Sequence, residues 1–247
     1  MYVHEYGDKN QPKWLMLHPL GLTGENIYNM CKDYLSWDYC ILSPDQGGHG
    51  SSGPYISLED EMNTLTGYLL ERGYTDLFVV SASSMGTIAA YEMLKDDRFH
   101  IENVWFESGL FKKNAPFVQF AMKRMFFRML DDFQKDPQSL SERHVKLYGE
   151  MYAEVMRDNF LRLTRTDIAR ISETFSHRKM VSLPEDVQKR IHLDWGDEDI
   201  LERLSRRDIP RWFPESEVTV RKGYGHCSYM AYHIEEYMAE LEQFIHR

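Results

Sequence analysis

A serine stands where a strongly apolar segment meets one rich in small residues. Residues 77–90 read Leu-Phe-Val-Val-Ser-Ala-Ser-Ser-Met-Gly-Thr-Ile-Ala-Ala, which predicts a buried strand that turns directly into a helix. At such a turn the serine takes a strained backbone conformation, and the residues two before and two after it must be small because strand and helix approach closely. Ser84 has small residues at both positions, whereas Ser83 has Met85 at the second. Ser84 is therefore the predicted nucleophile.

A histidine and an acid follow two later apolar runs. The segments Gly-Asp-Glu-Asp199 and Gly-Tyr-Gly-His226 each come directly after a run that is typical of a strand. Because active sites in open α/β sheets lie beyond the carboxyl ends of the strands, we expect both side chains beside Ser84. His226 would take the Ser84 proton as general base and return it to the leaving group. Asp199 would hold the imidazole tautomer and stabilise the imidazolium.

Two backbone N–H groups are predicted to stabilise the negative charge that acyl transfer develops on oxygen. The loop His18-Pro-Leu-Gly follows an early strand and would lie beside the serine turn. Pro19 has no N–H, so Leu20 is the predicted donor there, and Met85, directly after the nucleophile, is the second. Removal of one such donor typically costs about 2.7–4 kcal/mol of transition-state stabilisation. Taken alone, this loop is also typical of an ordinary turn.

The glycine-rich loop at residues 45–52, Asp-Gln-Gly-Gly-His-Gly-Ser-Ser, is interpreted as scaffolding. Its glycines permit a tight turn with positive φ. It is not a phosphate-binding loop, because the glycine spacing of that motif and its lysine are missing. His49 in this loop is therefore predicted to be structural.

These residues require a sheet that brings strand ends together, and the pattern predicts one. Short apolar runs alternate with helical segments, which is typical of a mostly parallel, doubly wound α/β sheet. The predicted strands are 2–6, 13–18, 39–44, 77–83, 103–107, 190–195 and 217–222. From 112 to 182 the strand pattern stops and several helices are predicted instead. We therefore expect an α/β core, 1–111 and 183–247, with a helical cap, 112–182.

The bulk composition excludes several classes of protein. A formal net charge of −10 over 247 residues argues against a nucleic-acid partner. No run approaches the length of a membrane span, and the first residues do not resemble a secretory signal. The three cysteines form neither a disulfide framework nor a metal pattern, so we expect no metal and a cytoplasmic protein. The oligomeric state stays open.

Together these motifs resemble the α/β-hydrolase superfamily, specifically its small capped serine hydrolases of the esterase and monoglyceride-lipase-like kinds. Residues 82–86, Ala-Ser-Ser-Met-Gly, match the Gly-x-Ser-Met-Gly turn of that family except at the first position. The further matches are His18–Gly21, Asp45–Ser52, Gly196–Asp199 and Gly225-His226. The resemblance implies a cap inserted after the sixth strand, the chain order Ser-Asp-His and no cofactor. Only one predicted strand precedes Lys13, so we expect the first strand of the family to be missing or abbreviated in this chain.

Alternatives to Asp199 remain open. Asp197 and Glu198 are its neighbours, although the spacing favours Asp199. Glu107 is a second possible acid, because it ends the strand 103–107 and some members of the family carry theirs at that point.

The cap is expected to set the substrate. Its aromatic and methionine residues favour an apolar acyl or alcohol group, although such residues at helical spacing usually serve packing. The candidates for the pocket lining are Phe117, Phe120, Met125, Phe126, Phe127, Met129 and Met151. The sequence thus predicts a serine hydrolase that cleaves a carboxylic ester, or a thioester or amide, of a small molecule. Alternatives are a carbon–carbon bond hydrolase or lyase with the same triad, and a ligand-binding protein without turnover.

Overall fold

A computed structural model describes residues 1–112, 116–138, 140, 142–175 and 180–247. A seven-stranded sheet runs through it in the order β1-β3-β2-β4-β5-β6-β7. The strands are β1 (Tyr2–Tyr6), β2 (Lys13–Leu17), β3 (Cys40–Asp45), β4 (Asp76–Ser83), β5 (His100–Glu107), β6 (Ile191–Gly196) and β7 (Glu217–Arg221). β1 is antiparallel to β3, and every other neighbouring pair is parallel. The predicted fold class and all seven predicted strands are confirmed.

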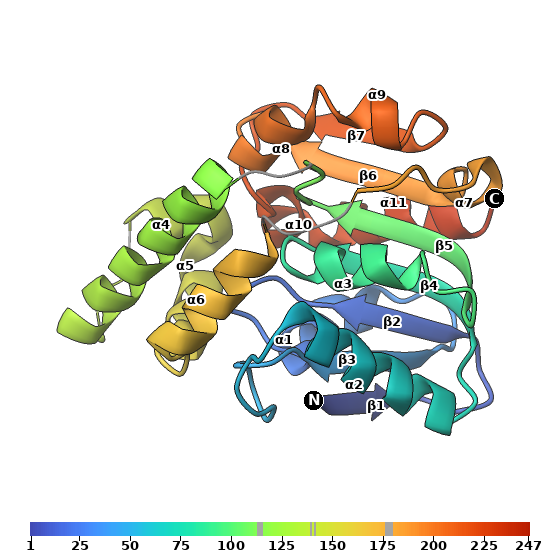
Figure 1. The fold of residues 1–247 in the computed structure, drawn as a ribbon, viewed down its shortest axis with the longest axis horizontal. Helices are drawn as coiled ribbons and strands as arrows, with labels where there is room; N and C mark the ends of the chain where they lie inside the picture. Colours follow the sequence, from blue (N-terminus) through green and yellow to red (C-terminus); the bar gives the residue numbers. More distant parts are fainter. Residues whose placement is uncertain (113–115, 139, 141, 176–179) are drawn as a thin grey trace.

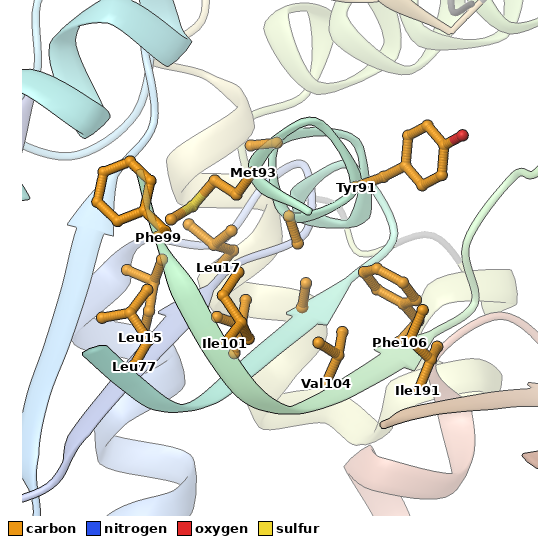
Figure 2. Packing of buried hydrophobic residues seen from close by; sticks show 14 of the residues in the cluster. Leu15, Leu17, Leu77, Tyr91, Met93, Phe99, Ile101, Val104, Phe106 and Ile191 are labelled. Carbon is orange, nitrogen blue, oxygen red and sulfur yellow. The ribbon is translucent and has the colours of Figure 1, made fainter. Parts of the chain in front are cut away.

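The sheet sends alternate side chains into two apolar cores, one on each face. The helices that cover the faces are α1 (Gly24–Cys31), α2 (Leu58–Glu71), α3 (Gly86–Met93) and α11 (Ile234–Ile245). Leu15 and Leu17 of β2 belong to the core that includes α2 and α3, whereas Trp14 and Met16 belong to the core that includes α1 and α11. Figure 2 shows part of the first core, including Leu17 and Phe106. Burial of each such side chain contributes about 1.5–3 kcal/mol.

The last helical segment differs from its prediction. The sequence pattern predicts one helix over 229–246, but the structure has α10 (Ser228–Tyr232) and α11, separated at His233. His233 leaves the helical region at φ −133 and ψ 49. Its Nε2 lies 2.7 Å from the hydroxyl of Tyr224. A single non-helical residue held by such a tertiary bond leaves no mark on the apolar periodicity.

The helices α4 (Pro116–Lys135), α5 (Glu142–Phe160) and α6 (Arg165–Thr174) follow β5 in the chain, ahead of one short helix and β6. They fall inside the predicted cap, 112–182, and the described part of that range contains no strand. The resemblance implies an insertion after the sixth strand, whereas these helices follow the fifth. The difference arises because only β1 precedes β2.

The inserted helices lie against the loops at the carboxyl ends of the strands (Figure 1). In α5, Met156 lies against Gly21 after β2, and Leu147 lies against Gly225 after β7. The amide of Asn159 donates to the carbonyl of Gly21 at 3.2 Å. α5 is therefore the inserted helix that contacts both loops beside the predicted site.

Short helices complete the architecture. They are η1 (Lys32–Tyr34), α7 (Glu185–Gln188), α8 (Ile200–Ser205) and α9 (Ile209–Trp212). Among the helices that the structure describes, none combines the length and the apolar character needed to cross a bilayer.

Candidate active site

Ser84 stands at the turn between β4 and α3 in a strained backbone conformation. Its φ is 48°, in a region that non-glycine residues rarely adopt. Its N–H donates to the carbonyl of Glu107 at 2.8 Å, which ties the turn to the neighbouring strand. A Cβ at Gly86 would overlap the carbonyl of Leu17, so only glycine fits there. The turn thus has the geometry that the small-residue pattern predicts.

The structure brings Ser84, His226 and Asp199 into one hydrogen-bonded chain. Nε2 of His226 lies 2.8 Å from Oγ of Ser84, and Nδ1 lies 2.9 Å from Oδ2 of Asp199. With Nδ1 protonated, the imidazole donates to the carboxylate and accepts from the serine hydroxyl. This tautomer leaves Nε2 free to take the hydroxyl proton.

Asp199, and not its neighbours, faces the histidine. Its other oxygen accepts the N–H of Leu201 at 2.8 Å, so it also caps α8. Asp197 instead accepts the N–H of Gly223 at 2.7 Å, and Glu198 is exposed. The spacing argument for Asp199 therefore agrees with the geometry.

The electrostatics of the pair favour charge on both partners. Burial by itself would lower the pKa of His226, but the carboxylate of Asp199 outweighs it and the pKa lies well above its ordinary value. Burial would likewise raise the pKa of Asp199, but His226, the Leu201 N–H and a hydrogen bond from Ser108 hold it below its ordinary value. The site therefore stabilises the imidazolium that proton transfer would create.

Ser108 is a buried residue of this site that the sequence reasoning missed. It follows β5 with φ 51°, and its hydroxyl accepts the N–H of Cys227 at 3.0 Å. Together with its hydrogen bond to Asp199, this contact joins the loop that carries Asp199 to the loop that carries His226 and Cys227. Cys227 has φ 53°. In the described chain, the non-glycine residues with positive φ are Ser84, Ser108 and Cys227. The one sequence signal that could have identified Ser108 was its position directly after a predicted strand.

Glu107, the alternative acid, has a different partner. Its carboxyl group accepts the hydroxyl of Ser83 at 2.9 Å. Burial, reinforced by the nearby Asp194, raises its pKa to about 8. It is therefore mostly protonated at neutral pH, and its partner is Ser83 beside the nucleophile rather than His226.

The two predicted oxyanion donors remain available. In the described part of the chain, neither the N–H of Leu20 nor that of Met85 donates to a protein acceptor. Each follows a strand end at this edge, β2 for Leu20 and β4 for Met85.

Two buried, neutral histidines hold the Leu20 loop. His18 donates from Nδ1 to the carbonyl of Pro19 at 2.8 Å and accepts the N–H of Gln46 at 2.9 Å. His49 accepts the N–H of Gly21 at 3.2 Å, which agrees with its predicted structural role. Burial lowers the pKa of both imidazoles, so each keeps one donor and one acceptor nitrogen at neutral pH.

Solved structures share this architecture over nearly the whole chain. The enol-lactonase from Burkholderia xenovorans LB400 is similar at a TM-score of 0.77 and 14% identity, covering 100% of this chain and 96% of that one. An alpha/beta hydrolase enzyme from a Medee basin deep-sea metagenome library is similar at 0.74 and 15%, covering 100% and 94%. The chain has the α/β-hydrolase fold. A thermophilic esterase from Thermogutta terrifontis is similar at 0.73 and 16%, covering 100% and 94%. No family model matches the chain, and no curated protein sequence is significantly similar.

On this α/β-hydrolase fold, the predicted pocket residues of the inserted helices divide into two groups. Phe117, Phe120, Met125 and Met151 are 80%, 62%, 45% and 61% exposed. Side chains this open to solvent do not form the wall of an enclosed pocket in this structure, and the helical spacing could not reveal which way they face. The others, Phe126, Phe127 and Met129, belong to or pack against the core that α4 shares with α6.

Side chains of α5 lie beside the loops that carry His226 and Leu20. Leu147 and Met156 lie against the glycines beside His226 and Leu20. Burial raises the pKa of Tyr148, whose hydroxyl also interacts electrostatically with His226 and Asp199. Among the described residues, no cluster of three His, Cys, Asp or Glu side chains is arranged to hold a metal ion.

Proposed function

We propose that the chain is a serine hydrolase that cleaves a carboxylic ester through an acyl-enzyme at Ser84. The observation that carries the proposal is the hydrogen-bonded chain from Ser84 through His226 to Asp199, at 2.8 and 2.9 Å. A serine hydroxyl is a weak nucleophile unless an adjacent base takes its proton, and this arrangement supplies that base.

In the first half of the reaction, His226 removes the Ser84 proton while Oγ attacks the ester carbonyl. The carbonyl oxygen becomes negatively charged and accepts hydrogen bonds from Leu20 N–H and Met85 N–H. His226 then returns the proton to the departing alcohol, and the carbon–oxygen bond of the ester breaks. The products of this half are the free alcohol and an acyl group on Ser84.

In the second half, water repeats the same steps. His226 takes a proton from the water, whose oxygen attacks the acyl carbonyl, and the proton then passes to Ser84 Oγ as it leaves. The carboxylic acid is released and Ser84 is restored. Asp199 keeps the imidazole oriented in both halves and stabilises its charged form.

The surroundings of Ser84 support an apolar group in the substrate. Leu147 and Met156 of α5 are apolar, and Phe160 is buried beside Met156 over Gly21. Two of the similar solved structures are an esterase and an enol-lactonase by name, which supports an ester as the substrate class. A thioester or an amide could react through the same steps.

A fluorophosphonate probe tests the nucleophile. We expect the wild type and Ser83→Ala to be labelled, because Ser83 donates to Glu107 and not to His226. Ser84→Ala should not be labelled. Labelling that survives Ser84→Ala would show that another residue is the nucleophile, and an unlabelled wild type would overturn the proposal.

Aryl esters of increasing acyl length then separate the reaction classes. We expect turnover by the wild type and loss of at least about 10⁴-fold in kcat/KM for Ser84→Ala. Labelling without turnover of any ester or thioester would favour a carbon–carbon bond hydrolase or a lyase with the same triad.

A further inference from the structure

Helix α4 carries apolar side chains on two opposite faces. One face packs against α6 through buried residues such as Phe126 and Leu130. The other face is exposed and forms one continuous stripe at spacings i, i+3, i+4, i+7, i+8 and i+11. The residues of this outer stripe are Phe117, Phe120, Ala121, Arg124, Met125 and Arg128. Figure 1 shows α4 on the outer side of the inserted helices.

The outer stripe departs from what a solvent-facing helix normally carries. A surface helix places charged and polar residues opposite its buried face, whereas this stripe presents two largely exposed phenylalanines and a methionine. Contiguous exposed apolar residues on one face mark an interaction site more often than scattered ones do. The stripe is therefore a candidate interaction surface, on which a partner would remove these side chains from water.

The charges in the stripe define the partner. Residues 116–130 contain three basic residues and no acidic one, in a chain whose net charge is −10. Arg124 and Arg128 have no carboxylate partner within the described residues, whereas Arg165 of α6 pairs with Asp131. At Asp131 and Asp132 the same face becomes acidic, so the stripe ends inside α4.

We infer that the outer stripe docks on an anionic lipid surface. A helix with aromatic residues and arginines on one face can bury the rings at the headgroup boundary while the guanidinium groups bind phosphates. A two-fold contact of this stripe with a second copy would instead bring Arg124 and Arg128 of both copies into one interface, and no residue of the stripe carries a carboxylate to pair with them. The acidic remainder of the chain is screened beyond about 8 Å at physiological salt. This docking does not depend on the proposed catalysis.

Flotation of the full chain with lipid vesicles tests the inference. We expect binding to equimolar phosphatidylcholine and phosphatidylglycerol, weak binding to phosphatidylcholine alone, and release at high salt. Arg124→Gln with Arg128→Gln should weaken binding to the anionic vesicles by roughly tenfold or more. Phe117→Ser with Phe120→Ser should weaken it similarly and should also abolish the weak binding to phosphatidylcholine alone.

Matched controls remove equivalent groups from other surfaces. Lys32→Gln with Arg207→Gln removes two exposed positive charges, and Trp37→Ser removes an exposed aromatic ring. Both controls should bind as the wild type does. Equal binding by the α4 variants and the wild type, or no binding to anionic vesicles, would overturn the inference. The inference would also be overturned if the protein formed a dimer in solution and only Phe117→Ser with Phe120→Ser dissociated it. That result would make a second copy the partner of the stripe.

Discussion

The two sides of the site differ in what fixes them. On the sheet side, Ser84, Ser108 and Cys227 have positive φ, and hydrogen bonds from neighbouring strands and loops hold them. On the helix side, α5 reaches the site mainly through packing contacts, with one hydrogen bond from Asn159 to the Gly21 carbonyl, and it is itself broken at Gly149, where φ is 77°. The difference suggests that the sheet side sets the chemistry and the helix side sets which substrate reaches it. Substitutions on the two sides should therefore change different kinetic parameters.

The largest expected effect on the sheet side is that of Asp199→Asn. We predict a fall in kcat/KM of about 10³–10⁴-fold, because the amide cannot hold the imidazole tautomer or stabilise its charge. The carboxylate raises the pKa of His226, so its removal should lower that pKa and move the acid limb of the pH–rate profile to lower pH. Asp197→Asn is the matched control. A comparable loss of kcat/KM in that variant would contradict the assignment of Asp199 as the acid.

Ser108 tests whether the link between the two loops matters. Ser108→Ala removes the acceptor of the Cys227 N–H, and we expect kcat to fall about tenfold with KM nearly unchanged. Ser108→Gly tolerates the positive φ but also lacks the hydroxyl, so it separates backbone strain from hydrogen bonding. Full activity of both variants in ester assays would show that Ser108 has no positioning role. A pH–rate profile should show the apparent pKa of the site moved in both variants.

The helix side should respond in selectivity rather than in rate. Met156→Ala opens space over Gly21, and we expect KM for long-chain aryl esters to fall relative to that for short ones by a few-fold. The maximal rate with acetyl esters should stay within about twofold. The exposed Met151→Ala is the matched control, since its side chain is largely in solvent. An equal loss of kcat for every acyl length would contradict the division between the two sides.

The smallest effect on activity is expected for substitution of Glu107. Its raised pKa should instead make the stability of the folded protein depend on pH. Its pKa in the folded state is raised from 4.5 to about 8, so the folded protein binds more protons than the unfolded chain across that range. Stability should therefore fall as pH rises from about 4.5 to about 8. Glu107→Gln should flatten this slope in thermal unfolding. Glu102→Gln, exposed on the same strand, should leave it unchanged.

Much of the sheet side could be predicted because its residues obey strict local rules. Apolar runs of strand length located all seven strands, and the small-residue requirement distinguished Ser84 from Ser83. Asp199 and His226 followed from their positions after strands. Ser108 escaped because a buried serine after a strand has no distinctive spacing, and its role depends on two loops that meet only in the folded chain.

The helix side could not be predicted to the same depth. Helical periodicity located α4, but α4 is apolar on both faces, so the pattern could not tell the packed side from the exposed one. Phe117 and Phe120 were expected to line a pocket and are largely exposed. The contacts of Leu147 and Met156 depend on how α5 lies over the loops, which no local pattern encodes.

The acyl-enzyme itself is the most direct test of the proposed chemistry. The wild type would be mixed with p-nitrophenyl butyrate, quenched in acid within the first turnovers, digested and examined by mass spectrometry. We predict a butyryl group on Ser84, together with a burst of p-nitrophenol, and neither in Ser84→Ala. Steady release of p-nitrophenol without a modified peptide, or a butyryl group on Ser83, would contradict the account.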